Sequence, residues 1–294
     1  MSKKVGPKKA YGWKILKAKK ALKQKHRIKS NAFNLIFGRS DKKIIIKARP
    51  KVTALILDAG CGRGFYLRAI SLYDFPQEIY GIDTNKIYLV KARQSCNDKR
   101  VRLKEISIYD TKYPSNFFDF IICSEVLEHL DDDRKALVEL KRILKSNGSL
   151  IITVPNYNFP FLWDPFNWIL MRFFKTHINK SIWWLAGIWA DHKRLYTKED
   201  IANKVKEYFK IADQKLFLYW CWPFSHFLLY GIGKNIVEKL GWADFNRFNF
   251  ISEKTFSRLV AYVIRLPSQF LDKLSKTNSA VNICIRAKNK YKFK

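Results

Sequence analysis

Acidic residues are scarce in this 294-residue chain, which has 25 aspartates and glutamates against 56 lysines and arginines and a formal net charge of +31. Residues 1–30 contain twelve basic residues and no acid. A lysine-rich overall composition accounts for part of this excess, but not for an acid-free N-terminal segment. A positive field of this size attracts polyanions. We therefore expect a partner with phosphate groups, either nucleic acid or an anionic membrane surface.

Cysteines are also few and form no C-x-x-C pair, which argues against a zinc site and against a disulfide framework. The five are Cys61, Cys96, Cys123, Cys221 and Cys284. Residues 1–30 are too charged to contain the apolar core of a signal peptide. The uncharged stretch 216–233 is interrupted by Pro223, Ser225 and His226, so no transmembrane helix is expected there. These features predict a reducing, cytoplasmic location.

The most informative segment is a glycine-rich turn behind a short apolar run. Residues 54–57 predict a buried strand, and Asp58, Gly60 and Gly62 follow before a helical pattern begins. A second short strand ends in Asp83. Glycines let the backbone pass close to a ligand, and an acid at the end of the next strand can bind two ribose hydroxyls. The pattern predicts a nucleoside cofactor.

Spacing distinguishes two classes of nucleoside cofactor. A dinucleotide fingerprint has the pattern G-x-G-x-x-G, but here Phe65 occupies the third place and the extra glycine comes one residue early, at Gly64. Asp58 lies two residues before the first glycine. A carboxylate at that position is unfavourable beside a pyrophosphate but suits the ammonium group of a methionine moiety. We therefore expect S-adenosylmethionine, and not a nicotinamide dinucleotide.

In these features the chain resembles the class I S-adenosylmethionine-dependent methyltransferases, whose first motif is D-x-G-x-G-x-G. The resemblance covers about residues 53–156 and is strong with the ubiquinone- and menaquinone-biosynthesis type, because the strand at 118–123 is followed by E-V-L-E-H and then by a helix, a glycine stop and a fifth strand. It implies a Rossmann-like, doubly wound α/β fold. Such a fold has a mostly parallel seven-stranded sheet with helices on both faces.

The alternation of strand and helix patterns predicts the same architecture from the residues themselves. Strands are expected near 53–58, 78–82, 101–106, 118–123, 149–154, 211–220 and 280–287, and helices near 64–72, 85–95 and 132–145. Ligands of such sheets bind at the carboxyl ends of the strands. The residues that match the family's cofactor-binding positions are Asp58, Gly60, Cys61, Gly62, Asp83, Thr84, Ser107, Ile108 and Ser124. Ser107 stands where many relatives carry an acid that binds the adenine amino group, and Ile108 is expected to pack on the ring.

The sequence predicts catalytic residues less well than cofactor-binding residues, because methyl transfer mainly requires an aligned nucleophile and the exclusion of water. A general base is needed only for a hydroxyl, weak-acid or carbon-acid acceptor. His129 and Glu125 are the catalytic candidates. Some quinone-pathway relatives hold a divalent metal with residues that match Glu125, Glu128 and His129, although many relatives with this pattern have no metal, and none is expected here. His192 is expected to form a structural hydrogen bond or to face the acceptor.

The chain divides into a basic N-terminal extension, 1–30, and a methyltransferase domain, 31–294. The extension is interpreted as a basic amphipathic helix on a membrane, as a nucleic-acid-binding arm, or as a solvated segment. Two aromatic-rich insertions, about 156–190 and 222–275, follow the fifth and sixth strands and are expected to cover the active-site mouth. Eight of the nine tryptophans lie in or near them, and tryptophan favours boundaries between apolar and wet surroundings.

These observations favour a methyltransferase that acts on a small amphipathic or lipid-linked acceptor, peripheral to the inner face of the membrane. The alternative is an RNA methyltransferase that uses the basic extension for phosphate contacts. Against it, the turn after the fourth strand lacks the Asn/Asp-Pro-Pro-aromatic motif of base-amino methylation. A third hypothesis is a non-catalytic binding protein of the same fold. The intact Asp58, Gly60, Gly62 and Asp83 argue against it.

Overall fold

The computed structural model describes residues 54–182, 185–219, 224 and 278–290. The predicted extension at 1–30 and nearly all of the predicted insertion at 222–275 lie outside these residues. Within the described part of the chain, no helix is long and apolar enough to cross a bilayer.

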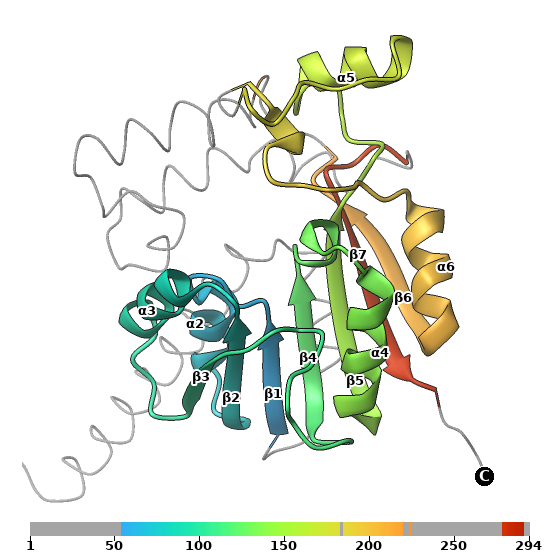
Figure 1. Ribbon diagram of the computed structural model, residues 1–294. Coiled ribbons are helices and arrows are strands. Elements are labelled where there is room, and N and C mark those ends of the chain that lie inside the picture. Colours follow the sequence, from blue (N-terminus) through green and yellow to red (C-terminus); the bar gives the residue numbers. More distant parts are fainter. Residues whose placement is uncertain (1–53, 183–184, 220–223, 225–277, 291–294) are drawn as a thin grey trace, which may run out of the picture.

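Seven strands form one sheet in the order β3-β2-β1-β4-β5-β7-β6 (Figure 1). They are β1 (Ala54–Ala59), β2 (Pro76–Asp83), β3 (Val101–Glu105), β4 (Phe118–Ser124), β5 (Leu144–Pro155), β6 (Phe209–Phe217) and β7 (Asn282–Asn289). The first five strands pair in parallel, and β7 lies antiparallel between β5 and β6. The predicted seven-stranded, mostly parallel sheet is confirmed. Because β1 to β4 are parallel neighbours, their carboxyl ends meet along one edge.

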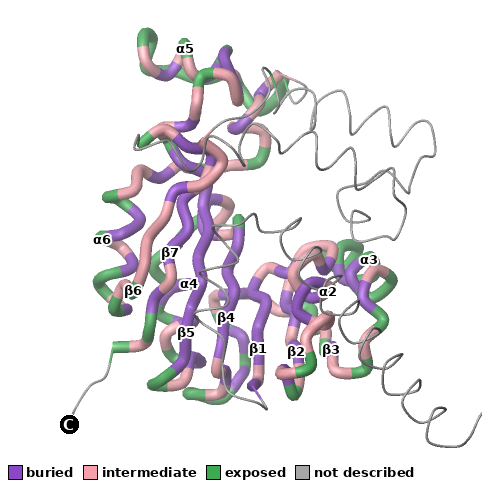
Figure 2. The backbone as a smooth tube through the Cα atoms, turned by 180° about the vertical axis from the view of Figure 1, so that it is seen from behind, coloured by how far each residue is buried: buried purple, intermediate pink, exposed green. Residues whose placement is uncertain are grey.

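Helices cover both faces of this sheet, as predicted. In the described residues the helices are α2 (Phe65–Ser71), α3 (Lys86–Ser95), α4 (Asp133–Ile143), α5 (Pro165–Phe173) and α6 (Lys198–Tyr208), with the short 3₁₀ helices η1 (Leu127–His129) and η2 (Gly187–Trp189). Side chains alternate between the two faces along a strand. Thus Leu57 of β1 belongs to the core cluster that includes α4 and α6, whereas its neighbour Ile56 packs with α2 and α3. Figure 2 shows β1, β4 and β5 buried along most of their lengths.

The fifth strand begins earlier than the sequence indicates. It was expected at 149–154, but β5 starts at Leu144 and pairs there with Phe118 of β4. The pairing then shifts, so that Phe120 lies opposite Ser149. Both Leu144 and Phe118 are fully buried, and this burial extends the strand across the irregular stretch in between. The expected glycine stop, Gly148, therefore lies within the strand.

The described part of the first insertion contains α5 and a small core of its own. Asp164 caps α5 by accepting a hydrogen bond from the backbone N–H of Asn167, and Pro165 occupies the first turn. The second carboxylate oxygen of Asp164 accepts from the N–H of Ile188, which ties α5 to η2. The buried Phe159, Met171 and Ile188 form this core, with Trp163, Trp168, Trp189 and Leu195 packed against it. These tryptophans therefore stabilise the insertion itself.

Candidate cofactor and acceptor site

The glycine-rich turn after β1 is held against the end of β2 by its backbone. The N–H groups of Gly60 and Cys61 both donate to the carbonyl of Ile82, at 2.8 and 2.9 Å. Gly64, with a φ of 82°, then starts α2. The predicted strand, turn and helix are thus present at the carboxyl end of the sheet, where ligands of this fold bind.

Glycine stands at two positions of the turn for different structural reasons. At Gly60, with a φ of 77°, a Cβ atom would come within 2.4 Å of the Cγ2 atom of Val126, so a side chain is excluded by packing. At Gly62, with a φ of 50°, a Cβ atom would meet nothing within 4 Å. Gly62 therefore faces open space beside the turn, and its backbone is accessible to a ligand, as the predicted cofactor requires.

Asp83 connects the end of β2 with the glycine turn. Its Oδ2 atom accepts a hydrogen bond from the N–H of Gly62 at 2.8 Å, and its Oδ1 atom accepts one from the N–H of Asn85 at 2.8 Å. A carboxylate can accept about four hydrogen bonds, so two positions remain for hydroxyl donors. This capacity matches the predicted role in binding a ribose diol.

Asp58 is almost fully buried at the end of β1, and its Oδ2 atom has no hydrogen-bond partner among the described residues. Burial, and then the negative charge of Asp83, raise the pKa of Asp58 to about 8. An unpaired buried carboxylate is costly, and a nearby cation would relieve that cost. The structure therefore fits the expected contact with the ammonium group of a methionine moiety.

The other predicted cofactor residues lie along the same edge of the sheet. Thr84 follows β2 and is exposed, and Ser107, after β3, is half-buried. The Oγ atom of Ser107 accepts a hydrogen bond from the N–H of Tyr109. Ile108 is buried within the core cluster of the α4 face. The thiol of Cys61 is buried, which raises its pKa, so this residue contributes shape and backbone and not a thiolate.

Ser124, at the end of β4, lies in a short chain of hydroxyl groups. Its Oγ atom donates to the hydroxyl of Tyr66 at 2.8 Å and lies 2.6 Å from the Oγ1 atom of Thr153. Thr153 in turn donates to Glu125 at 2.8 Å. Tyr66 and Thr153 were not singled out from the sequence, because a tyrosine on a helix and a threonine in a strand carry no local signal of such a network.

Glu125 and Glu128 occupy different surroundings, although the sequence places them on one turn. Glu125 has a φ of 54°, and its Oε1 atom accepts hydrogen bonds from Thr153 and from the Nδ2 atom of Asn282 in β7. Glu128 is completely buried in η1, and neither of its carboxylate oxygens has a hydrogen-bond partner among the described residues. Burial, and then the nearby Glu125, raise the pKa of Glu128 well above its usual value.

Two histidines approach the buried Glu128. The Nε2 atoms of His129 and His192 lie 3.8 and 4.0 Å from its Oε1 atom, and the two rings are 4.8 Å apart. The Nδ1 atom of His129 lies 2.8 Å from the carbonyl oxygen of Asp191. A carbonyl can only accept, so Nδ1 carries the proton and Nε2 keeps its lone pair when the ring is neutral. The lone pair of His129 therefore faces the Glu128 side of the ring.

This arrangement has two chemical capacities. The donor atoms of Glu128, His129 and His192 all lie within 4.8 Å of one another, and a carboxylate with two imidazoles is a suitable ligand set for a divalent cation. Within the described residues His192, and not Glu125, thus completes the group. The same lone pair of His129 can accept a proton from a methyl acceptor.

Comparison with known proteins identifies a methyltransferase domain in this chain. A methyltransferase domain family matches residues 57–152. An uncharacterized protein of Methanocaldococcus jannaschii is 30% identical over 189 residues, which are 59% of this chain and 76% of that protein. A tRNA U34 carboxymethyltransferase of Vibrio cholerae is 30% identical over 107 residues, 35% of this chain and 32% of that enzyme. The chain therefore spans only about a third of that second relative.

Solved structures show the same fold at low sequence identity. An S-adenosylmethionine-dependent methyltransferase from Mesorhizobium loti superposes with a TM-score of 0.51 at 15% identity, over 84% of this chain and 96% of the other. The chain belongs to the class I S-adenosylmethionine-dependent methyltransferases. It is an enzyme of that class, and its cofactor is S-adenosylmethionine. The narrower likeness to the quinone-biosynthesis type stays a prediction.

Proposed function

We propose that this methyltransferase acts on a small amphipathic or lipid-linked acceptor at an anionic membrane surface. The single observation that carries the proposal is an exposed apolar face on α5 and the residue that follows it. Phe166, Ile169, Phe173 and Phe174 are 46%, 39%, 71% and 67% exposed. Spacings of three and four residues place Phe166, Ile169 and Phe173 on one side of the helix, and Phe174 follows at its C-terminal end.

Exposed phenylalanines at helical spacing are unusual on a protein surface that meets only water. Each phenylalanine that leaves water contributes roughly 1.5–3 kcal/mol, so two or three suffice for reversible membrane binding. Lys175 and Lys180 follow the apolar face within the same insertion and are exposed. Together with the net charge of +31, they favour a surface of anionic lipid.

The cofactor residues have defined roles in this proposal. Asp58 meets the ammonium group, Asp83 binds the ribose hydroxyls, and the backbone near Gly62 lies alongside the cofactor, with Thr84, Ser107, Ile108 and Ser124 completing the pocket. Bound S-adenosylmethionine supplies an electrophilic methyl group on a sulfonium. The protein then has to align the acceptor with that group and to keep water away.

His129 is the proton acceptor when the methylated atom is a hydroxyl or a weak acid. Its Nε2 lone pair is directed by the Nδ1 contact with the carbonyl of Asp191. The carboxylate of Glu125 already accepts two hydrogen bonds, which favours His129 over Glu125 as the base.

Sedimentation with lipid vesicles tests the membrane part of the proposal. We expect binding at physiological salt to vesicles that contain phosphatidylglycerol, and much weaker binding to pure phosphatidylcholine. The double variant Phe173→Ser/Phe174→Ser should lower the partition coefficient by about tenfold or more. Val138→Ser, which alters an apolar side chain of similar exposure on α4 (51%), is the matched control. Equal binding by both variants, or no binding to anionic vesicles, would refute a membrane surface as the site of action.

The second candidate is methylation of RNA, which the similarity to the tRNA U34 carboxymethyltransferase favours. The net positive charge would then serve phosphate contacts. Incubation with a labelled methyl donor separates the two candidates, because label enters either the organic-solvent extract of cells or the purified RNA fraction. Label in RNA alone would reverse the preference for a lipid-linked acceptor.

A further inference from the structure

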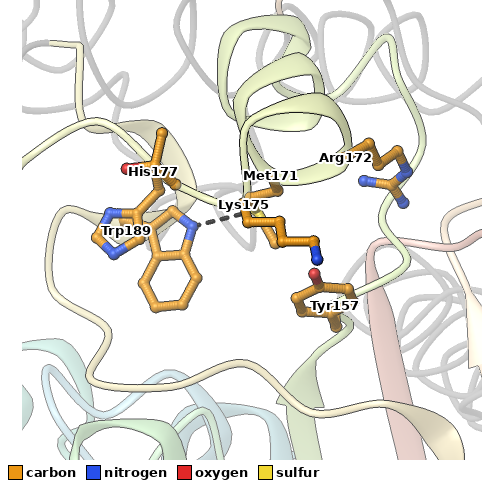
Figure 3. Close-up of a pocket in the computed structure, with 7 residues that line it drawn as sticks. Tyr157, Met171, Arg172, Lys175, His177 and Trp189 are labelled. Carbon is orange, nitrogen blue, oxygen red and sulfur yellow. Dashed lines mark hydrogen bonds between the residues drawn. The ribbon is translucent and has the colours of Figure 1, made fainter.

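A cavity of about 540 Å³ lies under α5, beside the end of β5 (Figure 3). Its lining consists of Tyr157, Met171, Arg172, Lys175, Thr176, His177 and Trp189. Two of these side chains are cationic, a third becomes so when protonated, and none is acidic. The apolar part of the wall comes from Met171 and Trp189, which contact each other through a hydrogen bond of 3.3 Å from the indole N–H to the sulfur.

Arg172 is the lining residue that most favours an anionic ligand. Its guanidinium is half-buried, stacked 4.4 Å from the ring of Trp168, and its Nη1 atom is buried without a hydrogen-bond acceptor among the described residues. Burial lowers the pKa of this arginine, so its charge is incompletely solvated and incompletely paired. A buried charged donor without a partner is costly. Arg172 also lines the cavity, so an anionic ligand there would lie beside its positive charge.

The remaining polar groups of the cavity wall suit the same ligand. In Figure 3 the amine of Lys175 reaches toward the hydroxyl of Tyr157, so one cation and one neutral donor face the same space. His177 stacks on Trp189 with ring centroids 4.1 Å apart. Its Nδ1 atom lies 3.0 Å from the carbonyl of Ile178, which again places the proton on Nδ1. His177 covers one face of the indole, so an apolar or unsaturated chain would contact the part of Trp189 that lines the cavity.

The position of the cavity connects it with the acceptor side of the sheet. Tyr157 follows the end of β5 by two residues, and its N–H donates to the carbonyl of Tyr196 at 2.8 Å. On the opposite wall, Trp189 precedes His192 by three residues in the chain, and His192 lies beside Glu128. The cavity is therefore lined by residues of α5 and by Trp189, which is close in sequence to His192 beside Glu128.

We propose that this cavity binds a phosphate ester group of the methyl acceptor, and that the acceptor is therefore a lipid-linked phosphate. Arg172 and Lys175 bind the anion, Tyr157 donates a hydrogen bond to it, and Met171 with Trp189 contact the attached chain. This inference rests on the proposed function, because α5 brings the lipid to the cavity. It adds the chemical class of the head group that the site selects.

Calorimetry on the full chain loaded with S-adenosylhomocysteine tests the assignment. The probes are octyl phosphate, octanol and inorganic phosphate. We expect octyl phosphate to bind at least tenfold more tightly than either of the others, since it alone has both the anion and the chain. Arg172→Gln and Lys175→Gln should each weaken it about tenfold. The matched control Lys180→Gln removes an exposed cation of the same insertion that does not line the cavity and should leave the affinity unchanged.

Three outcomes would overturn the inference. An equal loss in Lys180→Gln would show that the general positive field binds the probe. Inorganic phosphate binding as tightly as octyl phosphate would exclude recognition of a lipid chain. Displacement of octyl phosphate by a short single-stranded RNA, itself dependent on Arg172, would assign the cavity to nucleic-acid phosphates. Binding of S-adenosylhomocysteine is measured on the same samples, so failure of the cofactor site is distinguished from failure of the cavity.

Discussion

The carboxylate of Asp83 accepts a 2.8 Å hydrogen bond from the backbone N–H of Gly62, so the acid at the end of β2 also fixes the glycine turn after β1. The two residues are 21 positions apart in the chain. One side chain thus performs two tasks, because the same carboxylate shapes the turn and retains acceptor positions for a ribose diol. Loss of its charge should affect the cofactor site more than the fold.

Asp83→Asn should weaken binding of S-adenosylhomocysteine by about 10- to 100-fold, since hydrogen bonds to a charged group contribute about 1.5–3 kcal/mol. The amide keeps the size of the side chain but has one oxygen, so either Gly62 or Asn85 loses its acceptor and the thermal unfolding midpoint should also fall. Calorimetric titration gives the affinity. Glu199→Gln, an exposed acid in the first turn of α6, is the control, and a similar loss there would mean that net charge alone governs binding.

Alanine at the two glycines of the turn should separate folding from cofactor binding. Gly62→Ala directs a methyl group into open space, so it should cost only about 1 kcal/mol of stability for the positive φ while lowering cofactor affinity severalfold. Gly60→Ala drives a methyl group into Val126 and should lower the unfolding midpoint more. The double variant Gly60→Ala/Val126→Ala should recover part of that loss. No recovery would show that the backbone angle, and not the contact with Val126, requires glycine there.

The buried Asp58 makes cofactor binding a proton-linked process. Because its pKa is raised to about 8, most of the free enzyme carries this acid protonated at pH 7. An ammonium group favours the ionised form, so binding should release up to about one proton and should strengthen as the pH rises toward 8. Titrations in buffers of different ionisation enthalpy measure the release. Asp58→Asn should abolish it, and an unchanged release in that variant would place the proton elsewhere.

The raised pKa of Asp58 also makes the stability of the free protein depend on pH. A carboxyl group whose folded pKa lies above its unfolded pKa favours the native state in its protonated form. Its contribution is therefore complete in acid and is lost as the pH rises from about 4 through about 8. S-adenosylhomocysteine should offset that loss, so the stabilisation by ligand should be larger above pH 8 than below pH 6.

The sequence was sufficient to predict the sheet and to place Asp58, Gly60, Gly62 and Asp83 at strand ends, because both depend on local patterns. Apolar runs bounded by Gly60 and Asp83 mark strand ends, and parallel strands bring such ends together. Longer-range contacts were not predictable in this way. His192 lies beside His129 and Glu128 because the chain returns to them after the first insertion. The contact between His129 and Asp191 spans 62 residues of sequence. The prediction that Gly148 ends the preceding helix was wrong, because α4 ends at Ile143 and Gly148 lies within β5.

The sequence of the first insertion contains a helix-start signal that is easily overlooked among its many aromatic residues. Asp164 followed by Pro165 is typical of a helix start, since aspartate caps and proline is preformed at the first position. This pair predicts α5, and the apolar spacing after it predicts an amphipathic helix. The cavity beneath has no such signature, because Arg172 and Tyr157 come from separate segments and meet only in three dimensions.

Substitution of His129 should separate turnover from cofactor affinity. His129→Ala should lower kcat by about 100-fold or more if the imidazole is the general base, and should leave binding of S-adenosylhomocysteine within about twofold. Glu125→Gln should have a smaller effect on kcat. Comparable losses of turnover and cofactor affinity in His129→Ala would contradict a role in proton transfer.

The hydroxyl of Tyr196 donates a 2.6 Å hydrogen bond to the buried carboxylate of Asp133, which also accepts from Lys204 at 2.9 Å. Burial opposes ionisation of Asp133, but these bonds outweigh it and hold its pKa below the usual value. Because Asp133 begins α4 and Lys204 lies in α6, the contact joins the two helices on one face of the sheet. Tyr196→Phe should therefore lower the free energy of unfolding by about 1.5–3 kcal/mol.

The lowered pKa of Asp133 also makes the free energy of unfolding depend on pH. A carboxylate with a depressed folded pKa contributes stability above its unfolded pKa of about 4, and that contribution is lost as the pH falls through the folded pKa. In Tyr196→Phe the folded pKa rises toward the unfolded value, so the acid-induced loss of stability should be smaller and should end at a higher pH than in the unsubstituted protein. Urea titrations at several pH values measure both quantities. Tyr208→Phe, which removes a hydroxyl from a half-buried tyrosine in α6, should change neither, and a matching shift in that control would refute the Asp133 contact as the cause.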